Sequence, residues 1–165
     1  MNSVLLAFLL IQAPGPPVSE IALYNQIVQA QQADRMKLGL AFESRFPKST
    51  HLVDIYSLLM DAFTAQNNPA QALAYGEKTI QLNPKDLHAL AVVARQLAVS
   101  GANLDKAAQY ARRALEAADG LKGAAPPSNY TAQSWAEFLS TNRSSAESTL
   151  TYIQQATLNL LKRRR

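Results

Sequence analysis

The side chains that most often catalyse reactions or bind metals are scarce in this sequence. It contains no cysteine, which excludes thiol catalysis and disulfides, and only two histidines, His51 and His88. His51 has one carboxylate at helical spacing, Asp54, but a zinc site needs three or four ligands. We therefore predict no metal site and no cofactor.

Two aspartates, Asp54 and Asp61, have the spacing of an acid and base pair. Seven residues separate them, which places both on one face of a helix. Paired carboxylates can exchange protons in catalysis, but two acids on a solvated helix face are the ordinary explanation. The serines lie neither in a nucleophile elbow nor in a glycine-rich phosphate loop. The sequence thus predicts a protein that is not an enzyme.

The net positive charge is concentrated at one end of the chain. The protein has sixteen basic and twelve acidic residues, a formal charge of +4. The run Lys162–Arg165 accounts for the whole excess, so the rest of the chain is neutral. Such a tail commonly keeps a terminus solvated, and contact with an anionic surface is the less favoured alternative. We predict no nucleic-acid partner.

The amino terminus holds an apolar run, Val4–Ile11, followed by a stretch rich in proline and glycine. Eight residues are too few to span a bilayer as a helix, so no stable membrane span is predicted. Their length fits the hydrophobic part of a secretory signal peptide, although no basic residue precedes them. Residues 1–16 are therefore predicted to be a signal peptide or a frayed apolar segment. If residues 1–13 are a signal, the protein is exported to the periplasm or cell envelope; otherwise it is cytoplasmic.

Two stretches of the chain recur with nearly the same period, which indicates tandem repeats. A shift of 34 residues aligns the apolar positions of Tyr56–Phe63 with those of Leu90–Leu97. A shift of 35 residues aligns those of Ala72–Ile80 with those of Ala107–Leu115. The extra residue falls in a turn, where insertions are tolerated best.

Each repeat contains two helical patterns. Apolar side chains recur three and four residues apart within Tyr56–Phe63, which predicts an amphipathic helix. Pro69 suits the first turn of the next helix, and Asn83-Pro84 is predicted to end it. Abundant alanine and leucine, with few aromatics, favour helix over sheet. The predicted fold class is all-α.

The stretch ALAYGEKTIQLNP, from Ala72 to Pro84, closely resembles the second helix and terminal proline of the tetratricopeptide repeat. The resemblance is clearest over residues 52–118. It implies an α-solenoid of antiparallel helix pairs, a tetratricopeptide-like superhelix. Residues 17–165 would form this repeat domain, with a degenerate pair at 17–47, repeats at 50–84 and 85–119, and terminal helices at 128–165.

The sequence departs from the family pattern inside the first clear repeat. Met60 stands where the family has a small residue, and Gly76 stands where a bulky aromatic is common. We expect Tyr75 to fill part of the space left by Gly76. Ala107 and Ala114 are expected to lie between helices, because small side chains allow a close approach.

The carboxy-terminal region keeps a near-helical apolar register from Trp135 to Leu161. Either one long helix or two helices broken near Asn142 would account for it. Its later part resembles the first helix of a further repeat without a partner, so it would be the end of a truncated array or a solubilising cap. Trp135, the only tryptophan, is predicted to belong to the core.

The resemblance also implies where a ligand would bind. In this family the outward-facing residues of the first helices line a concave groove and contact peptides. The corresponding positions here are Asp54, Ser57, Asp61, Thr64, His88, Ala91, Arg95 and Ala98. The sequence therefore predicts a non-enzymatic scaffold that binds a protein or peptide partner. The alternative is a structural module of a larger repeat array without its own ligand.

One partner known for the family is excluded by the residues present. A subclass binds the acidic carboxy-terminal tails of chaperones with a lysine and asparagine clamp. Ser57 and Asp61 stand at those positions here, and Asp61 would repel a carboxylate.

Overall fold

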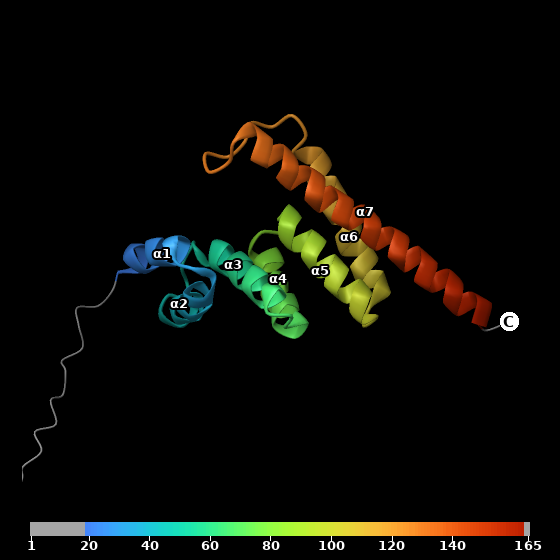
Figure 1. Cartoon of the computed structure of the whole chain (residues 1–165), viewed down its shortest axis with the longest axis horizontal. Helices are drawn as coiled ribbons and strands as arrows, with labels where there is room; N and C mark the ends of the chain where they lie inside the picture. The colour runs from blue at the N-terminus through green and yellow to red at the C-terminus, as the bar shows by residue number, and fades with distance from the viewer. Residues whose placement is uncertain (1–18, 164–165) are drawn as a thin grey trace, which may run out of the picture.

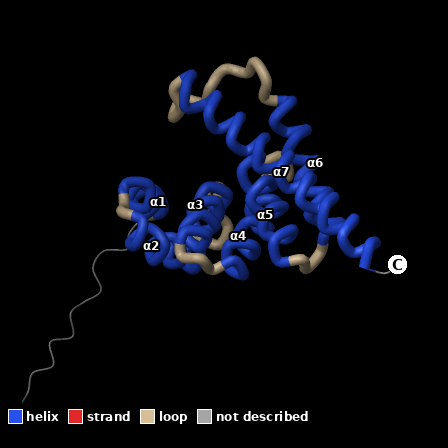
Figure 2. The backbone as a smooth tube through the Cα atoms, turned by 45° about the vertical axis from the view of Figure 1, so that its right-hand side comes forward, coloured by secondary structure: helices blue, strands red, loops and turns tan. Residues whose placement is uncertain are grey.

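The computed structural model describes residues 19–163. The predicted signal segment, residues 1–16, lies outside the described residues, as do Arg164 and Arg165. The described residues form α-helices joined by loops and contain no strand, which confirms the all-α fold class (Figure 2). Seven helices follow one another along this part of the chain: α1 (Glu20–Gln29), α2 (Gln32–Arg45), α3 (Leu52–Ala65), α4 (Pro69–Leu82), α5 (Leu87–Ser100), α6 (Leu104–Gly120) and α7 (Ala132–Arg163).

Local sequence signals set the ends of these helices. Pro69 occupies the first turn of α4, as predicted, and the Asn68 side chain accepts a hydrogen bond from the backbone N–H of Gln71. Asp86 caps α5 in the same way, accepting from the N–H of Ala89 at 2.9 Å. Gly101 ends α5 with φ of 66°, a left-handed conformation that glycine adopts without strain.

Neighbouring helices pack against one another along the chain (Figure 1). The exception to strict nearest-neighbour packing is α7, which lies against both α5 and α6. One hydrophobic core runs through all seven helices, from Leu23 in α1 to Ala146 in α7. Among residues 19–163, no helix combines the length and apolar character needed to cross a membrane.

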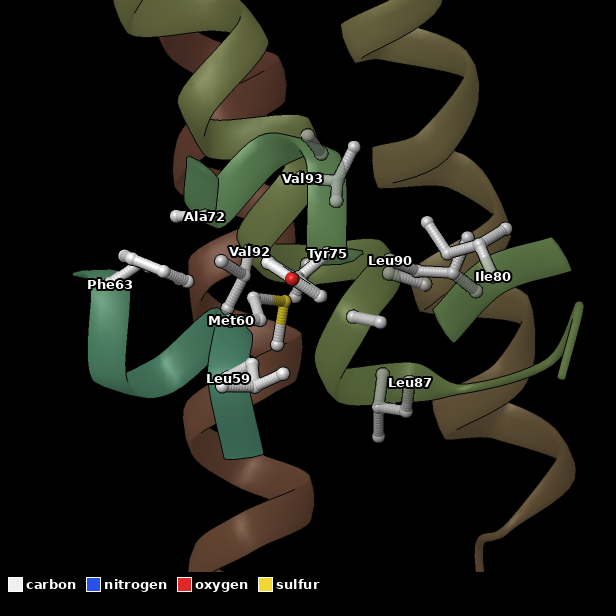
Figure 3. Packing of buried hydrophobic residues seen from close by; sticks show 14 of the residues in the cluster. Leu59, Met60, Phe63, Ala72, Tyr75, Ile80, Leu87, Leu90, Val92 and Val93 are labelled. Atoms are coloured by element: carbon white, nitrogen blue, oxygen red, sulfur yellow. The ribbon is translucent and has the colours of Figure 1, made fainter. Parts of the chain in front are cut away.

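At Gly76, the helices α3, α4 and α5 leave no room for a side chain. A Cβ added to Gly76 would clash with Cγ2 of Val93 and would lie 3.0 Å from Sδ of Met60. Met60 and Val93 are fully buried members of the cluster drawn in Figure 3. Glycine is therefore required here because Val93 and, at a longer distance, Met60 occupy the space that a side chain at position 76 would need. Tyr75 is buried beside it and stacks on Phe63 with ring centroids 5.5 Å apart.

The helix that follows is packed through alanine. Ala107, Ala111 and Ala114 of α6 are completely buried, as expected for small residues between helices. Ala74 of α4 is exposed. The helical register predicted for α4 and α6 is therefore correct.

The carboxy-terminal region is one continuous helix of 32 residues, which settles the choice between one helix and two. Its buried face is short and consists of Asn142, Ala146 and Thr149. Beyond this face, Leu158, Leu160 and Leu161 are exposed. Before it, the first turns of α7 and the preceding loop extend past the amino end of α5 (Figure 1).

Candidate binding groove

The amino-terminal half of α7 forms one wall of a groove of about 890 Å³. The opposite wall comes from α1 and the start of α2, and the floor from α3 and the first turn of α5. Four of the eight residues predicted to face a binding groove lie in this one, and three of those four belong to α3. The groove is lined by Tyr24, Val28, Arg35, Asp54, Ser57, Leu58, Asp61, Asp86, His88, Asn129, Tyr130, Ser134, Glu137, Phe138, Thr141 and Asn142.

On α3, the residues Asp54, Ser57 and Asp61 follow one face of the helix because they are three and four residues apart. The carboxylate of Asp54 accepts a hydrogen bond from the hydroxyl of Tyr24 at 2.9 Å. Partial burial raises the pKa of Tyr24, and the bond to the negative carboxylate raises it further. Tyr24 also stacks on His51, with ring centroids 4.2 Å apart. The α1 wall is therefore tied to α3 through an aromatic ring that faces the groove.

His88 joins three helices at the floor of the groove. Its Nε2 lies 2.7 Å from Oδ1 of Asp61 on α3, and its Nδ1 lies 3.1 Å from Oδ1 of Asn142 on α7. The amide nitrogen of Asn142 donates to the carbonyl oxygen of Phe138, so this buried amide has partners at both ends. Because both ring nitrogens are engaged, His88 serves as a bridge between helices.

The charge of His88 depends on these partners. Burial lowers the pKa of His88, but the hydrogen bonds and charges of Asp61, together with Asn142, outweigh burial and raise the pKa above its ordinary value of 6.5. The negative charge of Asp86, the N-cap of α5, raises the pKa of His88 further. The ion pair with Asp61 therefore persists to a higher pH than an isolated histidine would allow.

The α7 wall carries an aromatic cluster that sequence reasoning assigned to the core. Trp135 is half-buried and stacks on Phe138, with centroids 5.3 Å apart and planes 9° apart. Tyr130 packs its edge against Trp135 at 5.3 Å. Phe138 and Tyr130 line the groove, and Trp135 backs them. The buried indole nitrogen of Trp135 has no hydrogen-bond partner among the described residues.

The groove carries more acidic than basic groups. Asp54, Asp61, Asp86 and Glu137 line it, against a single arginine, Arg35, and the bridging histidine. The guanidinium of Arg35 donates to the carbonyl oxygen of Ala30 at 2.9 Å and more weakly to that of Val28, so it caps the end of α1. The structure thus provides negative charge and aromatic faces in one groove. Among the described residues no group of three metal-ligating side chains occurs.

The remaining predicted site residues lie elsewhere. Thr64 does not line the groove, and its hydroxyl donates to the carbonyl oxygen of Met60 within α3. Arg95 is exposed two turns beyond His88 and is also outside the groove. The prediction that Ala91 and Ala98 face the groove was wrong, since both are buried. They lie on α5, against which α7 packs, and small side chains allow that packing.

Three groove residues that sequence reasoning missed are Tyr130, Phe138 and Asn142. Each lies more than forty positions beyond His88, and no motif connects them to it. The only available signal was Asn142, a polar residue inside an otherwise apolar helical register. A buried asparagine of this kind needs a hydrogen-bond partner from another element.

Comparison with known proteins gives no family for this chain. No protein-family model matches it, and no curated protein matches it in sequence.

Proposed function

We propose that this protein is a non-enzymatic scaffold that binds a polypeptide partner in the groove between α1, α3, α5 and α7. We further propose that the helices form a short tetratricopeptide-like solenoid. The observation that carries the proposal is the convergence of polar and aromatic side chains from four helices on one groove. Four of these side chains, Asp54, Ser57, Asp61 and His88, are those that the family resemblance implies.

Three features support the solenoid. The helices pack in sequence order, α3 with α4 and α5 with α6, as antiparallel pairs of a repeat array would. The apolar positions of the two pairs correspond at shifts of 34 and 35 residues. In addition, α7 lies against both helices of the preceding pair, which is the position of the first helix of a following repeat.

The groove suits an extended chain better than a small molecule. At about 890 Å³ it is at the upper end of the size of drug-sized sites, which are about 300–1,000 Å³. Hydrogen-bonding groups and aromatic faces both line it, and a peptide backbone and its side chains can use both. Its walls belong to separate helices, so a bound segment would contact elements distant in sequence.

The test is to fill the groove with a larger side chain. Ser57 is half-buried on the groove floor, and Ser57→Arg should block the groove without disturbing the core behind it. Ser44→Arg on the exposed side of α2 is the matched control. After affinity capture of a partner, isothermal titration of the purified pair should show at least about tenfold weaker binding for Ser57→Arg. Unchanged affinity in Ser57→Arg would place the interaction outside the groove.

One observation favours a second function, that of a module in a larger repeat assembly. Tyr152, Leu158, Leu160 and Leu161 on the last part of α7 are all at least 43% exposed, the pattern of a helix that lacks a packing partner. Under this alternative, the protein should self-associate or unfold readily when isolated. The double variant Leu160→Lys, Leu161→Lys should then abolish self-association in sedimentation velocity, and capture should yield no partner.

A further inference from the structure

The acidic side chains of the groove differ from those elsewhere in the protein in the ion pairs that they form. Among the described residues, ion pairs link Glu43, Glu77, Asp119 and Glu147 to a lysine or an arginine. Asp61 pairs only with His88, which is neutral above its pKa. Asp54 on the floor of the groove and Glu137 on its α7 wall form no ion pair with any described residue. The groove therefore has uncompensated negative charge on both sides.

Elsewhere in the molecule, the same combination of carboxylate and aromatic rings holds a cation. The ammonium of Lys78 lies 2.6 Å from the carboxylate of Glu43. It also lies 4.5 Å from the ring centroid of Tyr75 and 5.1 Å from that of Tyr56. Lys106 is held similarly, by Glu77 at 2.5 Å and the Tyr110 ring at 5.5 Å. A cation over an aromatic ring and beside a carboxylate gains from both interactions.

The groove repeats this combination without an internal cation in it. Tyr24 lies beside Asp54 at one side of the groove, and Glu137 and Phe138 both line the α7 wall at the other side. Arg35, the one arginine lining the groove, is committed to the carbonyl oxygens at the end of α1. The aromatic rings also give the groove apolar surface that would contact an uncharged side chain next to the cation.

We propose that the groove selects a cationic polypeptide segment, one in which arginine or lysine alternates with apolar or aromatic residues. The cationic side chains lie between Asp54, Asp61 and Glu137, and the apolar side chains lie against Phe138 and Tyr130. This inference rests on the proposed function and specifies the chemistry of the partner. An acidic segment is rejected by the same carboxylates through repulsion.

The groove contains its own reporter for the test. Trp135 is the only tryptophan and stacks on Phe138, which lines the groove. A segment that reaches Phe138 should therefore change the emission of Trp135. The probes are short fluorescein-labelled peptides with leucine and phenylalanine at alternate positions and arginine, glutamine or glutamate between them. Anisotropy of the label measures affinity, and unlabelled peptides of the same sequence are used for the tryptophan signal.

The arginine peptide should bind and change the Trp135 emission, while the glutamate peptide should not bind. Added salt should weaken the binding, because partly exposed charges are screened. The double variant Asp54→Asn, Glu137→Gln should bind the arginine peptide about tenfold more weakly, since both changes keep shape and remove charge. The control double variant Asp105→Asn, Glu116→Gln makes the same charge change at exposed positions of α6 and should bind normally.

Two outcomes separate the inference from the function on which it rests. If the glutamine or glutamate peptide binds as well as the arginine peptide and Ser57→Arg abolishes that binding, the groove binds peptides but does not select cations, and the inference is overturned. If the captured partner binds Ser57→Arg with unchanged affinity, its binding site is not the groove and the proposed function fails, whereas an arginine peptide that binds without changing the Trp135 emission overturns only the inference. The absence of any binding by the arginine peptide would overturn the inference, while the captured partner still tests the function.

Discussion

The seam between α4, α5 and α6 and the groove between α1, α3 and α7 are built from opposite kinds of residue. In the seam, Gly76, Ala107 and Ala114 are buried, and the first of these has no room for a methyl group. In the groove, Asp54 and Glu137 are exposed and form no ion pair with the described residues. Size decides which residue is possible in the seam, and charge decides it in the groove.

Because of this difference, we expect different residues to determine stability and binding. A substitution in the seam forces packed helices apart, which costs free energy of unfolding but changes no surface. A substitution in the groove leaves the core intact and changes only what the surface attracts. His88 belongs to both regions, because it contacts the groove and ties α7 to the other helices. The comparison can be tested in order of the expected effect on stability.

The largest effect is expected at Gly76. Gly76→Leu should lower the free energy of unfolding by about 3 kcal/mol, the upper end of the usual cost of overpacking, because Val93 and Met60 occupy the space. Urea unfolding followed by circular dichroism measures it. Gly120→Leu is the control, since no atom lies near that position, and it should be nearly neutral. A tolerated leucine at position 76 would mean that α4 and α5 are farther apart than the structure shows.

The alanines of α6 should follow. Ala107→Leu and Ala114→Leu should each cost about 1–3 kcal/mol of unfolding free energy, because both side chains are fully buried between helices. Ala74→Leu should be nearly neutral, because Ala74 is exposed on α4. The same urea titrations apply. Equal costs at all three positions would contradict the seam described here.

His88 should show a smaller effect that depends on pH. Its pKa is raised in the folded protein by Asp61, so the ion pair stabilises the fold fully below pH 6.5, and this contribution is lost as pH rises through the raised pKa. His88→Gln can still hydrogen-bond to one neighbour but does not titrate. It should cost about 1 kcal/mol at acidic pH, with a smaller cost at alkaline pH.

The measurement is thermal unfolding of the unmodified protein and of His88→Gln, from acidic to alkaline pH. The groups facing His88 are Asp61 on α3, Asp86 at the start of α5 and the neutral Asn142 on α7. A difference between the two proteins that stays constant with pH would show that the pKa of His88 is the same in the folded and unfolded states, which would contradict the raised pKa.

The smallest effect on stability is expected from charge reversal at Arg95, near the groove. Arg95→Glu should change the unfolding free energy by less than about 0.5 kcal/mol, since Arg95 is exposed and lies outside the groove. Asp61→Lys should cost somewhat more because it loses the pair with His88. Only Asp61→Lys should weaken binding of the arginine peptide. Arg112→Glu, exposed on α6, is the control. Loss of binding in Arg95→Glu would extend the binding surface along α5.

The number of helices from α1 to α6 and the two ends of α4 could be predicted from the sequence, because the signals are local. Apolar spacing defines each helix over its own length, and Pro69, Asn83 and Gly101 act within one turn of the ends that they set. The α3 side of the groove could be predicted for the same reason. Once the apolar face of α3 is known, Asp54, Ser57 and Asp61 must lie together on another face.

The α7 wall of the groove and the partners of His88 were decided only by the tertiary structure. Asn142 is 54 residues from His88, and contact between them depends on where a long helix crosses two others. Apolar periodicity predicts that Trp135 and Phe138 share a face of their helix. It does not predict whether that face packs against a neighbouring helix or extends past the end of that helix. The same limit applies to Gly76. A side chain is excluded at this position by Val93 and Met60, which lie on other helices. Local patterns determine each helix, whereas the distances between helices depend on the volumes of side chains that meet only after folding.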